Sequence, residues 1–190
     1  NYYAVREVDE EASHPGYSYL KDYVIVKVTV TDDGQGTLTA TATPNGIIGD
    51  NELTITNTYT AEGRLELKAH KSLTGAALRE DNKFTFTLTG PKDTNQEKTN
   101  DLKGNVVFDA LKYDQSDIGQ KYVYTLTETN EGKAGYTYDS KIYTVIVEVK
   151  DNHDGTLSTP YTIQMQEKAG GTATDYTKSS DENVKLPEFS

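Results

Sequence analysis

The sequence predicts an all-β chain made of Ig-like antiparallel β-sandwich repeats, and two observations carry that prediction. First, apolar and polar residues alternate with a period of two, which is typical of strands with one buried face. Second, turn dipeptides such as Asp33-Gly34 and Asp154-Gly155 separate these segments at the short spacings of an antiparallel sandwich. No long segment has a helical period. The alternating segments are residues 23–30, 83–88, 122–127 and 143–149.

An internal repeat predicts how the strands are divided into domains. The motif at residues 16–19 (GYSY) returns at 135–138 (GYTY), and Gly36-Thr37-Leu38 returns at 155–157, each with an offset of 119. This period is the size of an independent domain. We therefore expect residues 1–60 to be the C-terminal half of one repeat. Residues 61–190 are expected to form a second repeat that lacks its last strand.

Composition and charge exclude several classes of function. The net charge of −11 and the absence of a clustered basic face argue against binding to nucleic acid. No run of about 18 apolar residues is present, so no membrane span is expected in this segment. The chain has no cysteine, and its three histidines lie in unrelated contexts, so no disulfide, metal site or cofactor is predicted.

Two glutamates are predicted to point into apolar faces. Glu7 follows Tyr3 and Val5, and Glu128 follows Tyr124 and Leu126, each at strand spacing that places all three side chains on one face. A carboxyl group that is buried without a cationic partner favours its neutral form, which can donate a hydrogen bond. The alternative is a strand glutamate that tilts out to solvent or pairs with a nearby lysine, and the recurrence of the glutamate in both repeats disfavours this alternative.

A lysine is predicted to share such a face near the start of the second repeat. Leu67, Ala69, Lys71 and Leu73 alternate with Lys68 and its polar neighbours. A buried amine loses its proton more readily and becomes a nucleophile. In the alternative interpretation, Lys71 extends its amine from the apolar face to solvent.

The end of the first repeat supplies an inward-facing amide. Asn57 alternates with Leu53, Ile55 and Tyr59 on one predicted face. A neutral lysine amine can attack an asparagine carboxamide while a protonated glutamate polarises the carbonyl, and ammonia leaves. Asn105 and Asn183 are further acceptor candidates, both expected at the surface.

These three motifs together resemble the isopeptide-linked pilin domains of Gram-positive bacteria. The match is to the streptococcal pilin type (FctA or T-antigen), related to the CnaB-type, transthyretin-like stalk domains of adhesins. The motifs are the lysine segment at 67–75, the segment from Tyr124 to Tyr136, and the closing residues 55–59. The resemblance implies that Lys71 is the nucleophile and Glu128 the catalytic acid of the second repeat. It also implies that Glu7 and Asn57 are the acid and acceptor of the first.

The resemblance implies a structural stalk module on the cell wall of a Gram-positive bacterium, with single-turnover bond formation as its only chemistry. Its partners would be neighbouring repeats or pilin subunits. The first repeat carries an acceptor strand but no opening lysine strand, whereas the second carries Lys71 but no closing strand. We therefore expect head-to-tail self-association in which residues 53–59 of one copy complete the second repeat of another. The alternative is an adhesive module for a host protein or glycan, for which an exposed aromatic patch would be the discriminating feature. Acidic turns at 31–34 and 151–155 lack calcium-loop spacing and are interpreted as hairpins.

Overall fold

The computed structural model describes residues 1–10, 12–44, 53–181 and 184–190. These residues fall into two compact units. The first unit comprises residues 1–61 with 153–155, and the second comprises residues 62–152 with 156–190. The described residues contain no α-helix, only strands and two short 3₁₀ turns, Glu80–Asn82 and Gln115–Asp117. The all-β prediction is therefore confirmed.

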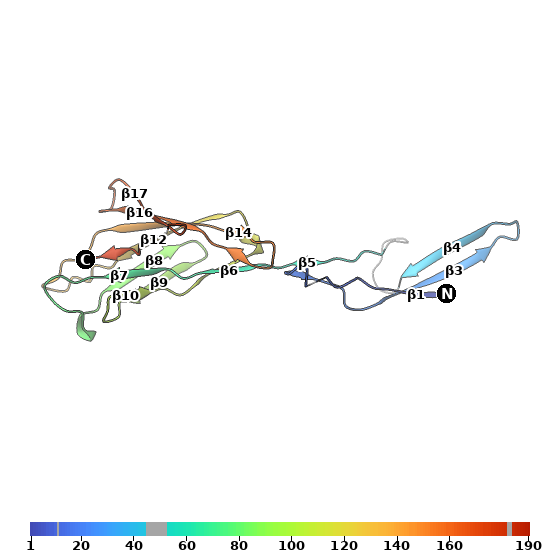
Figure 1. Ribbon diagram of the computed structural model, residues 1–190, viewed down its shortest axis with the longest axis horizontal. Coiled ribbons are helices and arrows are strands. Elements are labelled where there is room, and N and C mark those ends of the chain that lie inside the picture. The colour runs from blue at the N-terminus through green and yellow to red at the C-terminus, as the bar shows by residue number, and fades with distance from the viewer. Residues whose placement is uncertain (11, 45–52, 182–183) are drawn as a thin grey trace. The chain divides into compact units, whose positions relative to one another are not determined.

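The second unit is built on a six-stranded antiparallel sheet with the order β17-β16-β13-β12-β8-β9 (Figure 1). Its central strands pair in continuous register, from Lys121 opposite Glu148 to Thr127 opposite Ile142. Three of its strands, β8, β12 and β13, begin and end within two residues of the alternating segments expected at 83–88, 122–127 and 143–149. The bounds of all six strands are β8 (Thr85–Gly90), β9 (Thr94–Thr99), β12 (Lys121–Glu128), β13 (Ile142–Glu148), β16 (Tyr161–Gln166) and β17 (Thr174–Lys178).

Shorter strands face this sheet and complete the sandwich. β7 lies between β10 and β18, and β11 pairs with β6. Aromatic contacts join the two layers, since the Phe189 ring on β18 packs against Phe86 and Tyr143 of the large sheet. The bounds are β6 (Glu62–Leu65), β7 (Lys68–Lys71), β10 (Asn105–Val107), β11 (Leu111–Asp114), β14 (Lys150–Asp151), β15 (Leu157–Ser158) and β18 (Glu188–Phe189).

The core of the second unit follows from period-two alternation. Buried and less buried side chains alternate over residues 85–88 of β8, over residues 123–128 of β12 and along all of β13, as expected for strands with one face against an opposing layer. Each fully buried large apolar side chain contributes about 1.5–3 kcal/mol relative to exposure. The fully buried apolar side chains include Phe86, Leu88, Tyr124, Leu126, Tyr143, Val145 and Val147.

The first unit has a smaller set of strands. A three-stranded antiparallel sheet has the order β1-β3-β4, and the short strand β2 pairs with β5. β3 corresponds to the alternating segment expected at 23–30. The strands are β1 (Tyr2–Val5), β2 (Tyr17–Ser18), β3 (Val24–Asp32), β4 (Leu38–Pro44) and β5 (Thr58–Tyr59).

Candidate functional site

Lys71 is the last residue of β7 and points into the core of the second unit. The β7 alternation buries Ala69 and Lys71, whereas Lys68 is exposed and forms an ion pair with Glu66. The backbone of Lys71 is held on one side by the residue just before β10, because the Lys71 N–H donates to the Gly104 carbonyl at 2.7 Å. A charged side chain is thus carried inward by the same alternation that buries its apolar neighbours.

Glu128 is the last residue of β12, on the opposing sheet. Its position is set by pairing with Phe86 on β8. The Asp139 backbone N–H donates to Glu128 Oε2 at 2.6 Å. The other oxygen, Oε1, lies 2.8 Å from Lys71 Nζ, and both side chains have no exposed surface. Lys71 and Glu128 therefore meet inside the sandwich.

The surroundings of this pair are apolar. Lys71 Nζ lies 4.3 Å from the centre of the Phe84 ring. Although Nζ and Oε1 are close, neither atom makes a hydrogen bond of acceptable geometry within the described residues. Burying two charges without well-directed hydrogen bonds is costly and stabilises a fold poorly. Such an arrangement is more typical of a reactive site than of a stabilising ion pair.

The strand β18 runs beside Lys71 in parallel orientation. Phe189 is opposite Lys71 in the register, the His70 N–H donates to the Pro187 carbonyl, and the Ser72 N–H donates to the Phe189 carbonyl, both at 2.8 Å. Phe189 is fully buried. Because side chains alternate along a strand, the next inward-facing position is two residues beyond Phe189. Ser190 is the last residue of the sequence, so that position is not part of it.

The first unit brings its own two predicted residues together. Asn57 Nδ2 donates to Glu7 Oε1 at 2.6 Å, and the Leu20 N–H donates to Glu7 Oε2 at 2.8 Å. Glu7 is half-buried and Asn57 is exposed, unlike the buried pair of the second unit. The contact of Leu20 with Glu7 repeats that of Asp139 with Glu128, and 139 − 20 is again 119. Each predicted pair lies within one unit.

Sequence reasoning missed Phe84 and Asp139 at this site. A signal for Asp139 exists, because it directly follows the repeated Gly-Tyr motif that ends at Tyr138. Of the two further acceptor candidates, Asn105 is exposed and its side chain donates to Asp101. Asn183 lies outside the described residues.

The carboxylates of the acidic turn at 31–34 accept hydrogen bonds from backbone N–H groups of the same turn. Asp32 Oδ1 accepts the Gly34 N–H at 2.8 Å, and Asp33 Oδ1 accepts the Gln35 N–H at 2.7 Å. The backbone N–H groups of Gln35 and Thr37, which both donate to Asp33 Oδ1, lower the pKa of Asp33. Within the described residues, no three His, Cys, Asp or Glu side chains are grouped as metal ligands. None of these residues forms a helix long and apolar enough to span a membrane.

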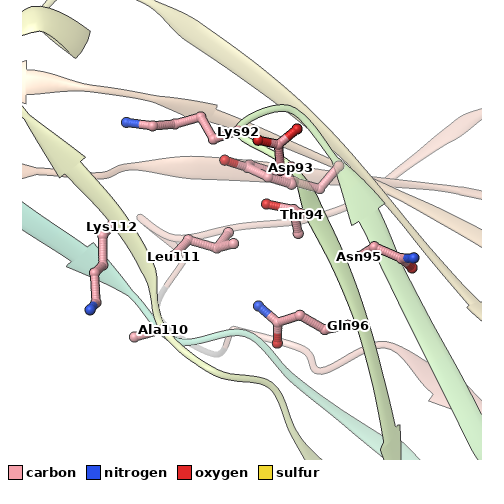
Figure 2. Close-up of a pocket in the computed structure, with 9 residues that line it drawn as sticks. Lys92, Asp93, Thr94, Asn95, Gln96, Ala110, Leu111 and Lys112 are labelled. Carbon is pink, nitrogen blue, oxygen red and sulfur yellow. The ribbon is translucent and has the colours of Figure 1, made fainter.

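The second unit has a shallow pocket beside β9 and β11, with a volume of about 350 Å³ (Figure 2). Of its lining side chains, Gln96 is already bound to backbone, since it donates to the Asp109 carbonyl and accepts the Asp109 N–H. Asp93 is the one carboxylate among the described residues that line the pocket. Glycoside hydrolysis generally needs two facing carboxylates, which this pocket does not provide.

Comparison with known proteins agrees with the geometry of the two units. No curated protein matches the chain with significance. The FctA family, described as the Spy0128-like isopeptide containing domain, matches residues 2–60 and 67–181. The resemblance drawn from the lysine, glutamate and asparagine motifs is thereby confirmed, together with the CnaB-like, Ig-like sandwich fold of this family. Because the two matched ranges cover nearly all of the sequence, the chain belongs to the FctA family of Spy0128-like isopeptide-containing domains.

Proposed function

We propose that this chain is a structural stalk module of a Gram-positive pilus or surface adhesin, whose units are closed by self-formed lysine–asparagine isopeptide bonds. The observation that carries the proposal is the buried contact of Lys71 Nζ with Glu128 Oε1 at 2.8 Å. Family membership supports it, because domains of this type occur in pilin backbone subunits. In this proposal the chain acts at the cell surface and associates with neighbouring repeats or pilin subunits.

The reaction needs no cofactor. A proton passes from the Lys71 ammonium to Glu128, which leaves a neutral amine and a neutral carboxylic acid. The amine nitrogen attacks the side-chain carbonyl carbon of an asparagine, and Glu128 polarises the carbonyl oxygen. As the new C–N bond forms, Glu128 takes a proton from the attacking nitrogen and passes one to the asparagine side-chain nitrogen. The bond to that nitrogen then breaks, it leaves as ammonia, and Glu128 ends protonated. Proximity in a fixed core supplies most of the acceleration.

The closing strand would deliver the asparagine. β18 already runs parallel to β7 with Phe189 inward, so the next inward position on that strand faces the region of Lys71 and Glu128. In the first unit the closing residues are Ile55-Thr56-Asn57, and Phe189-Ser190 fit the first two positions of that pattern. An asparagine directly after Ser190 would therefore occupy the acceptor position.

The repeat supports the proposed domain layout, in which residues 1–60 are the later half of one repeat and residues 61–190 form the next. One sheet face of the first unit is apolar and partly exposed, although Val24 on this face is buried. Tyr3 is 53% exposed, whereas its counterpart Tyr124 is 1% exposed; Val30 is 54% exposed, whereas Val149 is fully buried. In the second unit an opposing layer covers this face. We infer that strands equivalent to β7, β10 and β11 would cover it in the first.

This correspondence favours a structural role over the adhesive alternative. Exposed tyrosines are the feature that a host-binding module would need, and Tyr2, Tyr3, Tyr17 and Tyr23 of the first unit are exposed. Tyr3 belongs to the face whose counterpart forms the core of the second unit. The exposure of Tyr3 thus follows from an uncovered sheet face, and no host ligand is needed to explain it.

Intact mass spectrometry tests the proposal. The 190-residue chain is lengthened after Ser190 by the tripeptide Asn-Thr-Tyr, copied from residues 57–59. We expect the lengthened chain to be one ammonia lighter than its calculated mass. Glu128→Ala should abolish the loss and leave a folded domain, whereas Glu97→Ala, at an exposed position of β9, should retain it. Ammonia loss in the Glu128→Ala variant would contradict the assignment of Glu128.

We also propose that the unmodified chain can associate head to tail. Asn57 is exposed, as strand donation requires, and it would exchange its hydrogen bond to Glu7 for the site of the other copy. If residues 53–59 of another copy displace the short strand β18, Asn57 would arrive beside Lys71 and Glu128. Denaturing electrophoresis should then show a ladder that is lost in Asn57→Ala and kept in Asn95→Ala, an exposed asparagine on β9. A single monomer band would contradict strand donation while leaving the intramolecular reaction intact.

A further inference from the structure

Asp139 contacts both the catalytic acid and the closing strand. Its backbone N–H donates to Glu128 Oε2 at 2.6 Å, and its side-chain Oδ2 accepts the Ser190 N–H at 2.8 Å. The side chain is 6% exposed, and Lys141 holds it through Nζ to Oδ2 at 2.8 Å and its backbone N–H to Oδ1 at 2.9 Å. The contacts from Lys141 therefore hold the carboxylate independently of the closing strand.

We propose that Asp139 is a positioning residue that couples docking of the closing strand to the orientation of Glu128, an inference that rests on the proposed function. Ser190 directly precedes the proposed acceptor position. A hydrogen bond at Ser190 sets how far the strand advances along β7. Because the same residue holds Glu128 through its backbone, correct docking and correct orientation of the acid occur together.

Comparison with the first unit shows which contacts of Asp139 are specific to the second unit. Leu20 is the counterpart of Asp139 and makes the same backbone contact with its glutamate, but it has no carboxylate. There the closing strand is held from a different position, because the Thr58 N–H donates to the Ser18 hydroxyl at 3.1 Å. Both units thus hold the closing strand with a side chain from or just after the Gly-Tyr motif, through different residues.

A small shift of the closing strand along β7, which the hydrogen bond from Ser190 to Asp139 prevents, would matter for the reaction. A misplacement of reacting groups by about 1 Å can slow a reaction about a hundredfold. The amine of Lys71 and the carboxyl group of Glu128 are both in fixed positions, so the acceptor on the closing strand is the group whose position is left to be set. The Ser190 N–H is the last backbone donor before it.

The test uses the 190-residue chain lengthened by Asn-Thr-Tyr after Ser190. The chain is made by cell-free synthesis, and ammonia loss is followed by intact mass at timed intervals. Asp139→Leu copies the first unit, and Ser190→Pro removes the N–H donor while keeping an extended backbone. We expect each variant to slow bond formation by about tenfold to about a hundredfold. The Asp175→Leu variant, at an exposed position of β17, is the matched control and should react at the parent rate.

A double-mutant cycle separates positioning from a general loss of stability. If Asp139 acts through Ser190, the Asp139→Leu, Ser190→Pro double variant should be no slower than the slower single variant. Asp139→Asn, which keeps an oxygen acceptor for the Ser190 N–H, should retain most of the parent rate. Additive slowing, or unchanged rates in the single variants, would overturn the inference. A parent chain that forms no bond would overturn the proposed function as well, whereas a bonded parent with unaffected variants would overturn this inference alone.

Discussion

The isopeptide bond should raise the stability of the second unit by an amount that chain length determines. The comparison is between the chain lengthened after Ser190 by Asn-Thr-Tyr and the same chain lengthened by Ala-Thr-Tyr. Both begin with the same Lys71–Glu128 contact and β18, and they differ in the presence of an acceptor carboxamide. The free energy difference between them therefore reports mainly the bond itself.

The magnitude follows from the loop that the bond closes. Lys71 and the residue after Ser190 are separated by 191 − 71 = 120 positions, which is almost the whole second unit. For a loop of about 120 residues, the chain-entropy relation used for disulfides gives about 5 kcal/mol at 25 °C. In a domain of this size about 1 kcal/mol corresponds to about 4 °C in melting temperature, so the bonded chain should melt about 20 °C higher.

Differential scanning calorimetry measures this difference, after mass spectrometry has established which chain has lost ammonia. Lys71→Met in the chain that carries the asparagine is the control, and it should show neither the mass loss nor the gain in melting temperature. A bonded chain that melts within about 5 °C of the unbonded one would refute the loop-closure reasoning. It would mean that the unfolded state is already constrained, or that the bond strains the fold.

Three further predictions concern the folded second unit. Gly104 has a φ of +88°, and a Cβ there would clash with the Lys71 carbonyl oxygen. Gly132 has a φ of +67° and carries the backbone penalty without a clash, so Gly104→Ala should destabilise the unit by more than Gly132→Ala, as urea unfolding would measure. Leu88→Ala, at a fully buried position, should cost about 2–5 kcal/mol in the same assay, whereas the half-exposed Leu102→Ala should cost less than about 0.5 kcal/mol. Burial raises the pKa of Asp117, but hydrogen bonds from Lys92 and Tyr122 outweigh it and lower the pKa overall. The stabilisation from Asp117 should therefore be complete above its unfolded pKa of about 3.9 and be lost as the pH falls through the lower folded value, a dependence that Asp117→Asn should reduce. A pH dependence of unfolding that is unchanged in Asp117→Asn would contradict this assignment.

Much of the fold was predictable because it depends on local alternation. Apolar residues alternate along β12 and β13, and the structure buries Tyr124 and Leu126 of β12 and the alternate apolar residues of β13 and pairs the two strands. The same alternation predicted that Lys71 and Glu128 face inward, since side-chain direction along a strand has a period of two. The repeat also reappears in space, since the Leu20 N–H contacts Glu7 as the Asp139 N–H contacts Glu128, with donors 119 residues apart and glutamates 121 apart.

The sequence by itself determined the fold class, the repeat, and which side of each strand Lys71, Glu128 and the apolar residues occupy. Only the tertiary structure decided that Lys71 on β7 and Glu128 on β12 meet at 2.8 Å, that Phe84 covers the amine, and that Asp139 connects the acid to Ser190. The physical reason is that alternation sets the direction of a side chain within its own strand. Which residues of different strands meet depends on register and on how the layers pack. The contact between Ser190 and Asp139 joins residues 51 positions apart, and no period along the chain encodes it.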